Sequence, residues 1–168
     1  MAVCIGNQLT LVVNDTTVRT VTDKNLKSGK VHPEEIPMTA GFAVWANDNK
    51  TVFYTQIDDT TLRPQKVFRH VLGSPAESDV LVFHEADETF STFAYKTKSK
   101  KYIFIASTST LSSEYRFVPA DTPAAEFKVF QGRERDLEYD LDHYKNTFYV
   151  RTNMGAKNFR LMTAPPDK

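Results

Sequence analysis

The stretch Ser107–Ser113 gathers more hydroxyl side chains than any other part of the sequence, and hydroxyls can act as nucleophiles. A catalytic serine needs a positioned base and oxyanion donors, and it often sits on a sharp turn flanked by glycines. None of the 6 glycines forms a G-x-S-x-G motif, and none lies near this stretch. We therefore interpret it as a strand end with its connection, and we assign no catalytic residue.

The histidines do not have the spacing of a metal site. No two of them are four residues apart, and Cys4 is the only cysteine, so no cysteine pair joins them. The pattern favours structural histidines with satisfied hydrogen bonds over metal ligands, and neither a metal nor a cofactor is predicted. The four residues concerned are His32, His70, His84 and His143.

An acidic row is the third candidate. In 137-LEYDLDHY-144, strand alternation places Glu138, Asp140 and Asp142 on the face opposite the leucines. Two interpretations are open. The row is either a solvated strand face, which we favour, or a set of carboxylates that line a central channel and attract cationic peptides.

A basic stretch is the fourth candidate. Its lysines lie between two tyrosines over residues 95–102, a pattern that could bind single-stranded nucleic acid only with more basic area and a stacking platform. An exposed turn with solubilising charge is the favoured interpretation. The residues are Tyr95, Lys96, Lys98, Lys100, Lys101 and Tyr102.

Composition narrows the function classes. The 168 residues are 40% hydrophobic and 12% aromatic, enough for a packed core in one domain. The 21 basic residues equal the 21 acidic ones, which argues against a nucleic-acid partner. No window approaches the ~20 apolar residues of a membrane span, and the first residues make a poor secretory signal. We expect no membrane association and a cytoplasmic location. The single cysteine fits a reducing compartment, because it cannot form a disulfide within the chain.

A repeat organises the strands that must position these residues. Three segments of the sequence can be aligned with one another, and each reads as a hairpin with a strand, a polar turn and a second strand. Lys50, Lys100 and Lys145 take matching turn positions. The hairpins are 42-FAVWANDNKTVFYTQ-56, 93-FAYKTKSKKYIFIAS-107 and 138-EYDLDHYKNTFYVRT-152.

A second marker has the same period. A hydrophobic residue followed by arginine recurs in the strand after each hairpin, and a fourth strand follows as 80-VLVFHE-85 and 126-EFKVFQ-131. Four antiparallel strands in about 45 residues are typical of a β-propeller blade. The alternative is a β-sandwich with evenly spaced strands. The marker pairs are Val18-Arg19, Phe68-Arg69, Tyr115-Arg116 and Phe159-Arg160.

The predicted fold is therefore all-β, a β-propeller fragment of roughly three to four four-stranded blades. Residues 1–35 would end one blade, 36–87 and 88–132 would form two blades, and 133–168 would start a further blade. In 102-YIFIA-106, both strand faces are apolar, as expected between neighbouring blades. A partial ring leaves strand edges unpaired, so we expect either self-association or the remaining blades as a partner.

Several strings together resemble the prolyl oligopeptidase family of serine peptidases, in particular the propeller domain of its oligopeptidase B branch. The resemblance covers about residues 36–165 and is weaker over 9–25. The strings are 44-VWANDNKTVFY-54, 61-TLRPQKVFRHVLGSP-75, 95-YKTKSKKYIFI-105, 109-STLSSEYR-116 and 142-DHYKNTFYVRTNMGAKNFRL-161.

The resemblance implies a function that the residues alone do not. Members pair a seven-bladed propeller with an α/β-hydrolase domain that carries the Ser, Asp and His triad, and this branch cleaves peptides after Arg or Lys. No triad motif has a matching position here, so the chain is expected to be the non-catalytic, substrate-gating part, inactive alone, with a missing hydrolase domain as partner. The rival hypothesis is a stand-alone protein-interaction module built from propeller blades.

Overall fold

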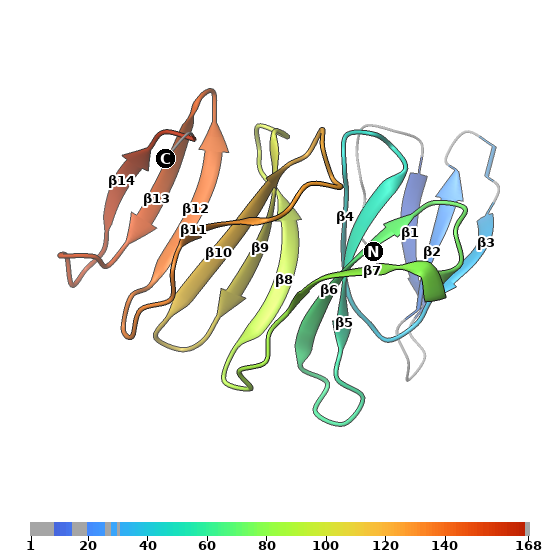
Figure 1. The fold of residues 1–168 in the computed structure, drawn as a ribbon, viewed down its shortest axis with the longest axis horizontal. Helices are drawn as coiled ribbons and strands as arrows, with labels where there is room; N and C mark the ends of the chain where they lie inside the picture. The colour runs from blue at the N-terminus through green and yellow to red at the C-terminus, as the bar shows by residue number, and fades with distance from the viewer. Residues whose placement is uncertain (1–8, 15–19, 26–27, 30, 167–168) are drawn as a thin grey trace.

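The chain folds into a row of antiparallel β-sheets (Figure 1). The computed structural model describes residues 9–14, 20–25, 28–29 and 31–166. Within these residues, 14 strands form four separate sheets, and the strands of each sheet are ordered as in the sequence. Each sheet is therefore an up-and-down meander, the architecture of a propeller blade. The predicted fold class, an all-β propeller fragment, is confirmed.

The first two sheets, here blades 1 and 2, contain three and four strands. A short 3-10 helix, η1 (Ala76–Ser78), precedes the last strand of blade 2. Blade 1 is built from β1 (Leu9–Asn14), β2 (Thr20–Asn25) and β3 (Val31–Ile36). Blade 2 is built from β4 (Thr39–Trp45), β5 (Thr51–Ile57), β6 (Pro64–Val71) and β7 (Val80–His84).

The other two sheets, blades 3 and 4, contain four and three strands. Blade 3 is built from β8 (Ser91–Lys96), β9 (Tyr102–Thr108), β10 (Ser113–Pro119) and β11 (Lys128–Gln131). Blade 4 is built from β12 (Tyr139–Tyr144), β13 (Thr147–Thr152) and β14 (Arg160–Ala164).

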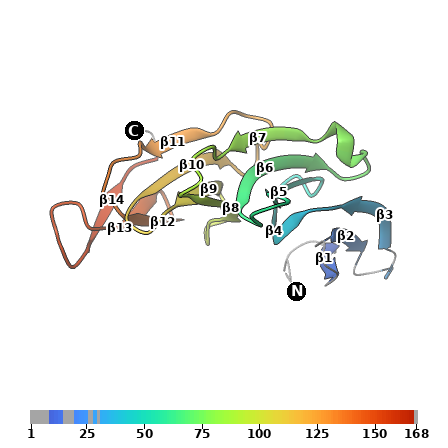
Figure 2. The same ribbon diagram turned by 90° about the horizontal axis from the view of Figure 1, so that it is seen from below.

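The blades lie side by side in chain order with their strands running between two common ends (Figure 1). The hairpin turns after β4, β8 and β12 gather at the upper edge, here the turn end. The links from β7 to β8 and from β11 to β12 gather at the lower edge, here the connection end. Figure 2 shows β7 and β11 along one side of the molecule, with β4, β8 and β12 toward the other.

The hairpin turns at the turn end correct one detail of the repeat. The Ala46 N–H donates to the Thr51 carbonyl at 2.8 Å, as the Thr97 N–H does to the Tyr102 carbonyl at 3.0 Å. Asn49, with φ of 59°, is therefore the equivalent of Lys100, with φ of 61°. The match of Lys50 with Lys100 was wrong by one residue, because a left-handed backbone conformation rather than a charge defines this turn position.

The second marker takes its predicted place in the third strand. Phe68 and Arg69 lie in β6, and Tyr115 and Arg116 lie in β10. Phe159 immediately precedes β14, which begins at Arg160. Val18 and Arg19 lie outside the described residues. Phe68 stacks on Tyr54 of the neighbouring strand at a centroid distance of 5.5 Å, so the hydrophobic member of the pair belongs to a packed face.

Strand β9 packs against both neighbouring blades, as its two apolar faces predicted. Ile103 and Ile105 belong to a buried cluster with Phe53 and Val67 of blade 2. Phe104 and Ala106, on the other face, belong to a buried cluster with side chains of blade 4. All four β9 side chains are 0% exposed, so the seams between blades form the core.

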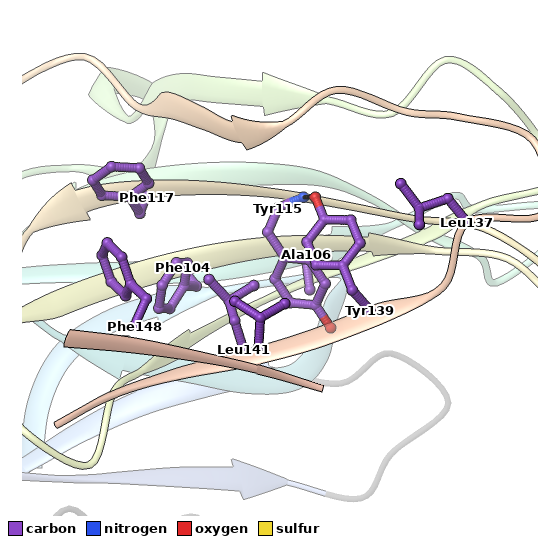
Figure 3. Close-up of a cluster of buried hydrophobic side chains, with 9 residues drawn as sticks. Phe104, Ala106, Tyr115, Phe117, Leu137, Tyr139, Leu141 and Phe148 are labelled. Carbon is purple, nitrogen blue, oxygen red and sulfur yellow. Dashed lines mark hydrogen bonds between the residues drawn. The ribbon is translucent and has the colours of Figure 1, made fainter. Parts of the chain in front are cut away.

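The seam between blades 3 and 4 is mostly aromatic (Figure 3). The ring of Phe148 of β13 lies with its centroid 5.8 Å from that of Phe104 and 5.4 Å from that of Phe117. It also contacts the rings of Tyr102 at 5.2 Å and His143 at 5.0 Å. Edge-on and tilted contacts of this kind add to the stability that apolar burial supplies.

Candidate functional site

The acidic row lies on β12, an edge strand of blade 4, and on Glu138, the residue just before this strand. The burial pattern alternates as predicted: Tyr139 and Leu141 are buried in the aromatic seam, whereas the side chain of Asp140 is 66% exposed. Glu138 and Asp142 are intermediate in exposure. The three carboxylates therefore share the strand face that points away from the seam with blade 3.

Two of the three carboxylates have partners that limit a ligand-binding role. Asp140 forms an ion pair through Oδ2 with Arg151 at 3.0 Å. Its other oxygen, Oδ1, accepts a long hydrogen bond of 3.4 Å from the Tyr115 hydroxyl. Asp142 Oδ1 accepts the backbone N–H of Lys98 at 3.1 Å. Tyr115 and Lys98 belong to blade 3, so both aspartates also connect the two blades. A channel-lining role for Glu138, Asp140 and Asp142 stays a prediction.

Phenol groups fix this strand against blade 3. The Tyr95 hydroxyl donates to the Leu141 carbonyl at 2.7 Å, and the Tyr139 hydroxyl donates to the Gln131 carbonyl at 2.7 Å. Burial, and then the charge of Asp140, raises the pKa of Tyr115 above its ordinary value. These phenols therefore stay protonated near neutral pH, and they act as hydrogen-bond donors rather than as bases.

A serine–histidine pair that sequence reasoning did not single out joins blades 3 and 4. The Ser99 hydroxyl lies 2.8 Å from His143 Nδ1. His143 is 1% exposed, and its ring packs edge-on against Tyr102 at 4.8 Å and against Phe148. Burial and then the charge of Lys101 lower the pKa of His143, which favours a neutral ring. A histidine enclosed by rings cannot pass a proton to substrate, so the pair is structural.

The other predicted structural histidines vary in burial. His70 is 1% exposed, and its Nδ1 lies 2.8 Å from Asp79 Oδ1, while the Tyr54 hydroxyl donates to Asp79 Oδ2 at 3.0 Å. This buried network holds the segment before β7 against blade 2. His84 is exposed at the end of β7, and His32 lies in β3.

The serine-rich stretch is scaffold, as its lack of glycines indicated. Ser107 is 0% exposed in β9, and the Ser109 N–H donates to the Ser112 carbonyl at 2.9 Å to close a turn. Ser112 Oγ accepts the N–H of Asp136 at 3.2 Å. The hydroxyls therefore support the turn and its link to blade 4.

The lysine-rich turn is exposed, and it contacts the neighbouring blade. Lys98, Lys100 and Lys101 are exposed. Asn47 of blade 2 donates from Nδ2 to the Lys100 carbonyl at 2.9 Å and accepts from Lys96 Nζ at 2.9 Å. The turn thus presents charge to solvent while its backbone ties blade 3 to blade 2.

Neither a metal site nor a membrane helix emerges from the described part of the chain. Over these residues, no group of three or more histidine, cysteine, aspartate or glutamate side chains is arranged to hold a metal ion. The same residues include no helix with the length and hydrophobicity that crossing a bilayer requires.

Comparisons with known proteins agree with this geometry. The family described as prolyl oligopeptidase, N-terminal beta-propeller domain, matches residues 14–168. Dipeptidyl aminopeptidase BI of Pseudoxanthomonas mexicana is 40% identical over 165 residues, which cover 96% of this chain and 23% of that protein. Protease 2 of Moraxella lacunata is 34% identical over 148 residues, covering 87% of this chain and 21% of that protein.

A solved structure supports the same relationship. Oligopeptidase B from Leishmania major superimposes with a TM-score of 0.88 at 27% identity, over 95% of this chain and 23% of that one. The chain therefore spans less than a quarter of each of these three relatives. With four consecutive meander sheets and a family match from residue 14 to residue 168, the chain belongs to the N-terminal β-propeller domain of the prolyl oligopeptidase family.

Proposed function

We propose that the chain is the non-catalytic, substrate-gating part of an oligopeptidase B-like serine peptidase, which cleaves peptides after Arg or Lys. The observation that carries this proposal is the 40% identity to a peptidase across 96% of the chain. Also in its favour, the serine–histidine contact at Ser99 and His143 is enclosed, which leaves the propeller blades a steric role. Peptides would pass the blades to reach a hydrolase domain, and folded proteins would be excluded.

Turnover by the complete protein tests this function. We expect it to hydrolyse a fluorogenic peptide with an internal Arg or Lys, and the 168-residue chain alone to be inactive. One relative is named a dipeptidyl aminopeptidase, so a substrate that releases an N-terminal dipeptide serves as the competing readout. Faster turnover of that substrate than of the Arg peptide would replace the proposed specificity. Peptide cleavage by the isolated chain would contradict a non-catalytic role.

The acidic row provides a separate test of substrate attraction. If the row attracts substrate, a variant with Glu138→Gln, Asp140→Asn and Asp142→Asn loses about three- to tenfold in kcat/KM for a cationic peptide. The loss is measured at low salt, because ions screen the field of the carboxylates. A neutral peptide should be unaffected. A control variant neutralises three exposed acids elsewhere, Asp59, Glu77 and Glu88. Equal losses in both variants would remove the steering role.

The alternative function, an interaction module without a hydrolase partner, makes a different prediction. The protein would then show no peptidase activity at any length and would bind a protein through its blades. Inactivity of the complete protein toward both substrates would favour this module.

A further inference from the structure

The connection end of blades 2, 3 and 4 carries a cluster of charges that the apolar seams do not explain. Arg133 lies in the link between β11 and β12, and Glu85 follows β7 in the link to blade 3. The two side chains form an ion pair at 2.6 Å between Arg133 Nη2 and Glu85 Oε2. The side chains of Glu85 and Arg133 are 4% and 28% exposed, so water screens this pair only partly.

Arg133 holds groups from more than one blade. Its backbone N–H donates to Glu114 Oε2 of β10 at 3.0 Å. Its guanidinium lies over the Phe90 ring at 3.6 Å, just before β8, and Nη1 lies 3.4 Å from Asp87 Oδ2. One residue of the β11–β12 link thus contacts both the β7–β8 link and the start of β10 in blade 3.

The link on the other side is anchored equally well. Arg63, before β6, donates from its guanidinium to the Phe90 carbonyl at 2.8 Å and to the Glu85 carbonyl at 3.2 Å. Asp87 accepts from the Thr89 N–H at 2.9 Å, and its own N–H donates to Glu85 Oε1 at 3.1 Å. The carboxylate of Glu85 is therefore presented to Arg133 by a link whose backbone is already fixed to blade 2.

We infer that Arg133 is a latch that holds the links of blades 2, 3 and 4 together at the connection end. Without its guanidinium, the buried Glu85 carboxylate would lose its charged partner, whereas Glu114 would keep its ion pair with Arg116, and the two links would separate from each other. The aromatic seam and the turn end make contacts of their own, through Phe148 and Asn47, so release would be local. The latch concerns how the blades are held, and it stands whether or not the chain gates peptides.

Arg151 supplies a matched control. It too pairs with a carboxylate, Asp140 at 3.0 Å, and its guanidinium lies over a phenylalanine ring, Phe159 at 4.1 Å. This ion pair is exposed, at 59% for Arg151 and 66% for Asp140, and it joins residues of blade 4 only. Arg133→Met and Arg151→Met therefore each remove a guanidinium that pairs with a carboxylate and lies over a phenylalanine ring. Only Arg133 makes these contacts between blades.

Hydrogen–deuterium exchange of the full chain tests the latch. We expect Arg133→Met to accelerate exchange at residues 85–90 and 132–137 by about tenfold or more, the effect of leaving a buried charge unpaired. Exchange at Asn47, whose N–H donates to the Ala120 carbonyl at the turn end, should not change. Arg151→Met should leave both ends unchanged.

Three results would overturn the inference. Exchange accelerated equally at the connection end and the turn end would mean a general loss of stability. Unchanged exchange at both ends would mean that Arg133 does not hold the two links together. An equal effect of Arg151→Met would mean that the position between blades is irrelevant. If Arg133→Met does not fold, Arg133→Lys decides, because a single ammonium cannot replace a planar guanidinium that contacts Glu85, Asp87 and Phe90 together. Its acceleration should be smaller and confined to the same two links.

Discussion

Replacing Phe148 by alanine should separate the stability of blade 4 from that of the other blades. The side chain is 1% exposed and contacts five rings in the seam between blades 3 and 4. Removal of a buried phenyl group costs about 3–5 kcal/mol, and the density of ring contacts here places Phe148→Ala near ~4 kcal/mol. A loss of that size lowers the folding equilibrium constant about 1,000-fold.

Tyr149 provides the control on the same strand. It follows Phe148 directly, but its side chain points to the other face and is 39% exposed. Tyr149→Ala should therefore cost less than ~1 kcal/mol, as surface substitutions do. Both variants keep the strand and its hydrogen-bond register, so their difference reports packing at the seam.

Urea unfolding with two probes would measure the effect. Circular dichroism follows all strands, whereas the fluorescence of Trp45, the 1 tryptophan of the sequence, follows blade 2, where it is 6% exposed. We expect the circular dichroism of Phe148→Ala to show an earlier transition than the Trp45 fluorescence. A loss below ~1.5 kcal/mol, or one equal to that of Tyr149→Ala, would refute the role assigned to the aromatic seam.

Three further predictions concern the turn end. Burial and then Lys101 lower the pKa of His143, so its contribution to stability is complete above its ordinary pKa of 6.5 and is lost as the pH falls toward the folded value. Urea midpoints should therefore drop from pH 7 to pH 5, and less so in His143→Gln. Asn47→Ala should cost about 1–2 kcal/mol in urea unfolding, because its side chain bridges two blades. Lys100→Gly should stabilise the fold by up to about 1 kcal/mol, because φ is 61° there, and this gain should appear as a higher thermal midpoint. Lys101→Gly should not raise the midpoint.

The candidate site was only partly predictable from the residues. Alternation in β12 correctly placed Tyr139 and Leu141 in the core and the carboxylates on the other face. It could not show that Asp140 pairs with Arg151 or that Asp142 accepts from Lys98. Local periodicity reports which side of a strand is buried, but it says nothing about which groups of another blade lie within hydrogen-bond distance.

Alternation and turn residues within about 45 positions were enough to predict the repeat, the all-β class and the two apolar faces of β9. The folded chain was needed to show that Asn49, not Lys50, is the equivalent of Lys100, since backbone conformation defines that position. It also decided the contact of Arg133 with Glu85, 48 residues apart. Such a pair forms only when stacked blades bring two links to the same end, and no local pattern records how blades stack.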